Sequence, residues 1–277
     1  MYPEVIVIRQ RLLSKTYELK LAPSMQCIID RTIETVTNPA SSITDILKII
    51  EIDPSISAKI LGIANSAYYN RGTNTCDLHH ALIKIGLNEL KNVILCLLIV
   101  DNLLKELKIR FSDLLEFWRH SIYVAHSAKI LAEKTLDYEP QKAYIVSLLH
   151  DIGKMVFYSE IDDYSKITHG VDVRERPIWE TERECFGIDH QEIGYIIAKK
   201  WRLPETVCSV IGNHHNTCNS ENNNRNLLKI TRLVDGFFYC QDTNGSPEKL
   251  ILLKEKDNIR MEVKKNMAII NINSHAG

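Results

Sequence analysis

Histidine and carboxylate side chains interrupt apolar helical segments throughout the second half of the chain. Glu116 and His120 lie four residues apart, so both project from one face of a helix. His150-Asp151 follows an apolar run, and Asp235 lies inside another. Together, the candidate ligands are Glu116, His120, His150, Asp151, His190, His214, His215 and Asp235. Imidazole and carboxylate donors from separate helices suit Fe, Mn or Zn, so the pattern indicates a divalent-metal site.

The pair His150-Asp151 imposes a geometric requirement. Adjacent residues cannot share one helix face, so both can point into one site only where the helix ends. Gly153 follows directly and supplies that irregularity. Lys154 is then placed to lie over a substrate phosphate as a point charge. If the protein is an enzyme, we expect Asp151 and Lys154 to be catalytic, with Asp151 bridging two metal ions.

A structural interpretation of these residues competes with the functional one. A single histidine on an apolar helix is commonly a hydrogen-bonded core residue, and His214-His215 at a helix end would also complement the helix dipole. However, polar side chains scattered singly through a core would each need a partner, and an unpaired one costs about 1–3 kcal/mol. We therefore predict that all the candidate ligands converge on one pocket from at least five helices or helix ends. A closed pocket without metal would make the cluster a polar core.

The elements that position these residues are helices, because apolar residues recur with helical spacing and alternating strand patterns are nearly absent. Asp53-Pro54 marks one helix start, and Asp189 with Glu192 forms an Asp version of a capping box. Gly86 ends a helix in the manner of a left-handed cap, and a long apolar helix follows over 88–107. The predicted fold class is all-α.

The chain divides where the character of its helices changes, near 108–113, since His, Asp and Glu enter apolar helices from there on. We predict an N-terminal helical extension, an N-terminal helical subdomain packed on a second helical bundle with the metal cluster, and a C-terminal extension without assigned structure. In residue numbers, these segments are 1–17, 18–110, 111–241 and 242–277.

Composition argues against several classes of partner. The 277 residues carry 34 Lys and Arg against 35 Asp and Glu, which gives no charge footprint for nucleic acid or anionic membrane. The seven cysteines form no CxxC pair, which is typical of reduced thiols. The N-terminus shows no signal-peptide pattern, and the longest apolar run, 93–100, is too short to cross a bilayer. We expect a cytoplasmic protein that binds neither membrane nor nucleic acid.

The order His120, His150-Asp151, Asp235 resembles that of the HD superfamily of metal-dependent phosphohydrolases, and Leu148-Leu-His-Asp-Ile-Gly-Lys154 matches its central motif. Within that superfamily, the chain resembles the HD-related output domain, HDOD, over about residues 20–240. The segments concerned are Leu21-Ala-Pro-Ser24, Ile52-Asp-Pro-Ser55, Ala64-Asn-Ser-Ala67, Ala81–Gly86, Phe117–Ser121, Glu184–His190 and Trp201–Pro204. The resemblance implies an HD-like helical bundle and a bacterial regulatory role.

The resemblance implies two alternative functions. The first is signal transduction through binding of another signalling protein or a nucleotide signal; the alternative is a metal-dependent phosphohydrolase or phosphodiesterase. The related HD-GYP phosphodiesterases, which cut cyclic di-GMP, use a similar extended ligand set, to which all eight candidates correspond. The Gly-Tyr-Pro element expected shortly after His215 is absent, and an Asn-rich stretch over 216–226 replaces it. This difference argues against turnover of cyclic di-GMP.

Overall fold

The structure is a computed structural model that describes residues 2–19, 30–32, 34–35, 38, 40–50, 54–65, 69, 75–86, 90, 107–135, 139–170, 176–216, 225–240 and 246–274. Every regular element within these residues is a helix, which confirms the all-α class. Two compact units form, one from Met1–Lys20 and Leu104–Val263, the other from Leu21–Leu103 and Lys264–Gly277. The finer division predicted from the sequence stays a prediction.

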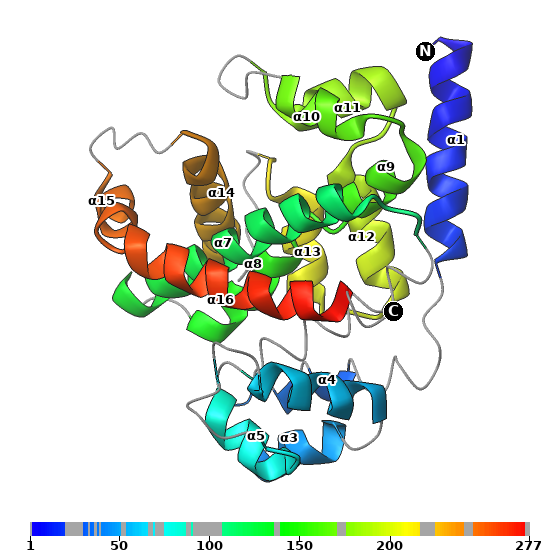
Figure 1. Cartoon of the computed structure of the whole chain (residues 1–277). Helices are drawn as coiled ribbons and strands as arrows, with labels where there is room; N and C mark the ends of the chain where they lie inside the picture. Colours follow the sequence, from blue (N-terminus) through cyan, green and yellow to red (C-terminus); the bar gives the residue numbers. More distant parts are fainter. Residues whose placement is uncertain are drawn as a thin grey trace. The chain divides into compact units, whose positions relative to one another are not determined.

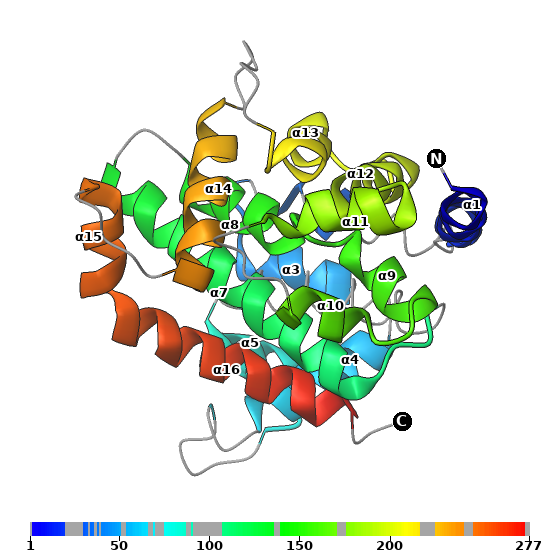
Figure 2. The same ribbon diagram turned by 90° about the horizontal axis from the view of Figure 1, so that it is seen from above.

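The first unit carries all the candidate ligands. Its helices are α1 (Pro3–Glu18), α7 (Phe111–Thr135), α8 (Pro140–Leu149), α9 (Lys154–Glu160), α10 (Tyr164–Gly170), α11 (Ile178–Phe186), α12 (His190–Lys200), α13 (Glu205–Asn213), α14 (Arg225–Cys240), α15 (Pro247–Lys254) and the start of α16 (Lys256–Ser274). Helices α7 and α8 lie side by side and both contact α14, while α12 packs on α13 and α9 (Figures 1 and 2). Trp118, Tyr144 and Phe157 are buried at the core of this unit.

Helix α1 belongs to the same unit although the sequence places it far from the ligands. It contacts α9, α11 and α12. Arg9 Nε donates to the carbonyl oxygen of Gly187 at 3.2 Å, and Arg11 donates to the carbonyl oxygen of Glu160. Both acceptors lie at helix C-termini, where carbonyl groups lack partners within the helix. Helix α1 therefore supplies hydrogen-bond donors to the C-terminal ends of α9 and α11.

In the second unit, α3 (Ile43–Ile50), α4 (Pro54–Ala64) and α5 (Leu78–Ile85) contact one another through buried isoleucines. Gly86 ends α5 with φ of 86° as predicted, but its ψ of 145° lies outside the left-handed helical region. The predicted cap at Asp53 and the predicted helix over 88–107 fall outside the described residues, apart from isolated positions. None of the helices in the described parts of the chain is long and apolar enough to cross a membrane.

The helix start at Asp189 is confirmed, but only half of the predicted capping box forms. The Asp189 carboxylate accepts a hydrogen bond from the backbone N–H of Glu192 at 2.9 Å. The Glu192 side chain does not return that bond; it lies 3.8 Å from Arg183. Asp189 is completely buried and also pairs with Arg183 Nε at 2.7 Å, so one carboxylate fixes α12 against α11.

The predicted interruption after His150-Asp151 is confirmed, because α8 ends at Leu149 and α9 begins at Lys154. The reason for Gly153 differs from the expected one. Its φ of −62° and ψ of −28° suit any residue. A Cβ at this position would lie 2.0 Å from the carbonyl oxygen of His190 and 2.7 Å from the backbone nitrogen of Gly194. Gly153 is therefore required by the close approach of α9 and α12.

This close approach predicts that Gly153→Ala destabilises the protein by about 1–3 kcal/mol, because backbone atoms must move to admit the methyl group. Thermal unfolding would measure the effect. Gly62→Ala is the control, since its added Cβ would have no atom within 4 Å; Gly62 lies inside α4. We expect that control to be neutral or stabilising, by up to about 1 kcal/mol. Equal melting temperatures for the two variants would contradict the close approach.

Candidate metal centre

The structure brings seven of the eight candidate ligands into two groups that share Asp151. The first group is His120, His150, Asp151 and Asp235; the second group is Asp151, His190, His214 and His215. Within each group, one ligand atom from every residue lies within 4.8 Å of the others. The side chains come from α7, the turn after α8, the start of α12, the turn after α13, and α14. Seven of the eight candidates therefore meet as the sequence predicts. Of these seven, His120, Asp151, His215 and Asp235 line one pocket and the other three do not. Metal binding itself stays a prediction.

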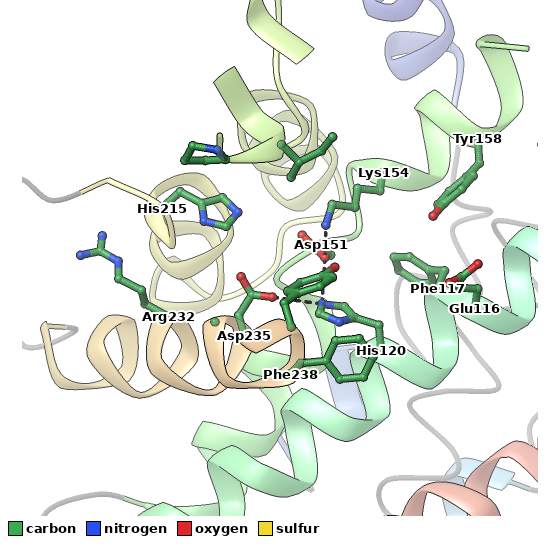
Figure 3. Close-up of a pocket in the computed structure, with 14 residues that line it drawn as sticks. Glu116, Phe117, His120, Asp151, Lys154, Tyr158, His215, Arg232, Asp235 and Phe238 are labelled. Carbon is green, nitrogen blue, oxygen red and sulfur yellow. Dashed lines mark hydrogen bonds and ion pairs between the residues drawn. The ribbon is translucent and has the colours of Figure 1, made fainter. Parts of the chain in front are cut away.

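Glu116 is the eighth candidate, and it belongs to neither group. Glu116 lies on α7, one helical turn before His120, and lines the same pocket as His120, Asp151 and Asp235. Its Oε1 lies 3.6 Å from Arg119. Figure 3 shows it beside Phe117, away from Asp151 and Asp235. The helical spacing predicts the shared face correctly, but the side chain reaches the pocket wall rather than the cluster.

In the first group, His120 lies between two carboxylates. Its Nε2 is 3.2 Å from Asp151 Oδ2 and 3.2 Å from Asp235 Oδ1. The Nε2 of His150 is 3.3 Å from the Nε2 of His120. All four side chains are buried, which leaves little water to satisfy them.

In the second group, the other oxygen of Asp151 faces two histidines. Its Oδ1 is 3.3 Å from His190 Nε2 and 3.5 Å from His214 Nε2. These two nitrogens are 3.2 Å apart. His215 completes the group next to His214, with ring centroids 4.2 Å apart.

Backbone carbonyl groups fix the tautomers of two ligands. His150 Nδ1 is 2.7 Å from the carbonyl oxygen of Ser147, and His214 Nδ1 is 2.9 Å from that of Ile211. A carbonyl oxygen only accepts, so each Nδ1 must carry a proton. In the neutral imidazole, the lone pair then belongs to Nε2, which points into the cluster.

Glu182 fixes the third histidine, and sequence reasoning missed it. Its Oε2 accepts from His190 Nδ1 at 2.6 Å and from the His190 backbone N–H at 2.8 Å. Its Oε1 accepts from the Tyr164 hydroxyl, and the side chain is completely buried. The available signal was its spacing with Ile178 and Phe186, four residues to either side, which puts Glu182 on the apolar face of α11.

The two aspartates carry the negative charge of the cluster. Burial raises the pKa of Asp151, but His150 and Lys154 outweigh it and hold that pKa well below its usual range. Burial likewise raises the pKa of Asp235, and hydrogen bonds from His120 and His150 outweigh it. Burial lowers the pKa of His214 to about 4. Burial also lowers the pKa of His150, but both aspartates outweigh this effect and raise it to about 10.

The residues present fit a divalent metal. Nδ1 of His190 donates to Glu182, and its Nε2 lies 3.3 Å from an Asp151 oxygen and 3.2 Å from the Nε2 of His214. Acceptors that face one another need a proton or a cation between them. Asp151 Oδ1, Asp235 Oδ1 and His215 Nε2 are among the buried atoms of the described residues that make no hydrogen bond of good geometry, although histidine nitrogens lie 3.2–3.3 Å from both carboxylate oxygens. Nitrogen and oxygen donors of this kind suit Fe, Mn or Zn.

A pocket of about 380 Å³ opens beside the two groups. Lys154 reaches into it, with Nζ 2.5 Å from Asp151 Oδ2 (Figure 3). Burial lowers the pKa of Lys154, but Asp151 outweighs this effect and keeps the pKa well above its usual range. The lysine therefore presents a fixed positive charge next to the shared aspartate, and its expected place over a substrate phosphate stays a prediction.

Arg232 links the two groups. Its Nε donates to the carbonyl oxygen of His214 at 3.0 Å, and its Nη2 donates to that of Asn216. On the other side of this turn, the backbone N–H of His215 donates to Gln191 Oε1 at 2.9 Å. Asp235 lies one turn beyond Arg232 on α14, so the helix that carries a ligand of the first group also holds the turn that contains His214 and His215.

Comparison with known families identifies the protein class. The HDOD domain matches residues 22–217, and the chain therefore belongs to the HDOD domain family. An uncharacterized protein of Treponema pallidum (strain Nichols) is 30% identical over 196 residues, which cover 70% of this chain and 37% of that protein. The chain thus spans little more than a third of the length of that relative.

Solved structures share the fold. An HDOD domain protein of unknown function from Geobacter sulfurreducens superposes with a TM-score of 0.72 at 24% identity, covering 97% of this chain and 98% of that one. A Marinobacter aquaeolei VT8 protein, named provisionally as a signal transduction protein, gives a TM-score of 0.67 at 20% identity, covering 98% of this chain and 66% of that one. At these identities, the likeness establishes the helical fold alone.

The Glu182–His190 contact predicts that Glu182→Gln weakens metal binding about 10- to 100-fold, because the carboxylate that orients His190 is lost. Titration of the apoprotein with Mn²⁺ or Zn²⁺ would measure the change. Glu184→Gln is the matched control, since Glu184 lies on the same helix but pairs with Arg176 at the surface. If both variants bind metal as tightly as the wild type, Glu182 does not orient a ligand.

Proposed function

We propose that this HDOD protein is a regulatory module that binds a pair of divalent metal ions and, beside them, a phosphate-bearing nucleotide signal. The observation that carries the proposal is the presence of two ligand groups that share Asp151 and border one pocket. The first group would hold one ion and the second group the other. When bound, two such ions would neutralise phosphate charge and polarise its P–O bonds.

The chain's own residues favour a small anionic ligand over a protein partner at this site. The volume of about 380 Å³ falls within the usual range of small-molecule pockets. Lys154 adds a positive charge that Asp151 holds in place, and a lysine at such a position attracts a phosphate group as a point charge. A standard protein interface, in contrast, covers roughly 800 Å² on each partner.

A metal-dependent phosphohydrolase is the second candidate. It is favoured by the position of Asp151, whose two oxygens face different ligand groups, and by Lys154 beside it. Lys154 would stabilise negative charge on the phosphate oxygens as a P–O bond breaks. The Asn-rich stretch that replaces the Gly-Tyr-Pro element lies mostly outside the described residues, so the expected lack of cyclic di-GMP turnover stays a prediction.

The first test is metal content. We expect protein purified without chelators to carry about two Fe, Mn or Zn ions per chain, because two ligand groups are present. His150→Ala and His190→Ala should each lower that content, since each removes a ligand from a different group. His79→Ala, which removes an exposed histidine of α5, is the control. A metal-free wild-type protein would exclude both candidate functions.

The second test separates signal binding from hydrolysis. Metal-loaded protein is titrated with AMP by calorimetry and assayed separately for release of p-nitrophenol from p-nitrophenyl phosphate and its diester. The regulatory proposal predicts AMP binding without turnover, and about tenfold weaker binding in Lys154→Met because a charge next to the phosphate is lost. Turnover that Lys154→Met abolishes would establish the second candidate instead.

A further inference from the structure

We propose that Gly236 and Tyr239 of α14 form a subsite that holds the planar base of the bound nucleotide. This inference rests on the proposed function and adds the position of the base. Phosphate binding alone requires only the metal centre and Lys154; the subsite would explain why the pocket extends beyond them.

The side of α14 that faces the pocket carries charged residues, a glycine and an aromatic residue. Arg232, Asp235, Gly236 and Tyr239 are spaced so that they share one helix face, and all four line the pocket. Gly236 is exposed, and a Cβ added there would have no atom within 4 Å. Glycine inside a helix is less favourable than alanine, so its use beside a metal-ligand candidate indicates a need for space.

Tyr239 provides a flat surface next to that space. Tyr239 is 45% exposed, although it lies at the edge of a buried cluster. Two neighbours hold the ring: Phe238, with centroids 5.2 Å apart and rings nearly perpendicular, and His120, with centroids 5.4 Å apart. An aromatic ring that neighbours hold in place and that is partly exposed can stack on a planar group without losing much freedom.

The lining of the pocket divides into two chemistries, as a nucleotide does. Lys154 and Asp151 supply charge, while Phe117, Ile178 and Tyr239 supply apolar or aromatic surface. Figure 3 shows Lys154 pointing at Asp151, with Phe117 and Phe238 beside His120 on the α7 side. A phosphate joined through a sugar to an uncharged aromatic base matches this division, whereas inorganic phosphate would leave the apolar part uncovered.

The experiment compares ligands that share a sugar phosphate and differ in the base. Binding of AMP, GMP and ribose 5-phosphate to the full-length, Mn²⁺-loaded chain is measured by calorimetry. We expect the wild type to bind both nucleotides at least about tenfold more tightly than ribose 5-phosphate, because one base stacks on Tyr239. Gly236→Leu fills the space and should remove this preference, while Mn²⁺ content and affinity for ribose 5-phosphate stay at the wild-type level.

Two further substitutions make the result independent of how well Gly236→Leu folds. Tyr239→Leu removes the ring and should abolish the preference, and Tyr239→Phe, which keeps the ring, should restore it. Lys229→Leu places the same leucine at an exposed position of α14 outside this pocket and serves as the control. Equal wild-type affinities for the three ligands, or a preference that survives both leucine variants, overturns the subsite. A wild type that binds none of the three overturns the proposed function as well.

Discussion

The buried carboxylate of Asp151 is the interaction on which the arrangement of the first unit depends. Its Oδ2 faces His120, His150 and Lys154, and its Oδ1 faces His190 and His214. A carboxylate without exposure to water must be surrounded by donors or cations, since its desolvation is costly. Five helices or helix ends therefore have to meet around one side chain. The approach of α9 to α12 at Gly153, too close for a Cβ, follows from that requirement.

The same local device occurs at two helix ends. His150 is the C-cap of α8 and His214 the C-cap of α13, and each contacts the carbonyl oxygen three residues earlier through Nδ1. Carbonyl groups in the last helical turn lack partners within the helix, so each histidine satisfies its own helix first. The same bond leaves Nε2 facing the centre. Helix termination and ligand orientation are thus achieved by one hydrogen bond.

The sequence predicts what depends on spacing along one helix or on the order of segments. It predicts the all-helical class, the break after His150-Asp151, the cap at Asp189 and the meeting of seven ligand candidates. It misses features that depend on contacts between distant segments. Glu182 is flanked two residues away by Glu180 and Glu184, and only the packing of α11 distinguishes it. The reason for Gly153 lies at the His190 carbonyl, which no local pattern reveals.

The alternative interpretation, a polar core without metal, makes a different demand on the geometry. A core cluster satisfied by hydrogen bonds places a donor opposite each acceptor, because buried polar groups otherwise lose their interaction with water. The Nδ1 bonds of His150, His190 and His214 meet that demand on the outer side of the cluster. On the inner side, histidine Nε2 atoms face carboxylate oxygens and one another at 3.2–3.5 Å. The outer bonds suit either interpretation, whereas the inner contacts need a proton or a cation between the facing atoms, and a shared metal ion would satisfy several of them at once.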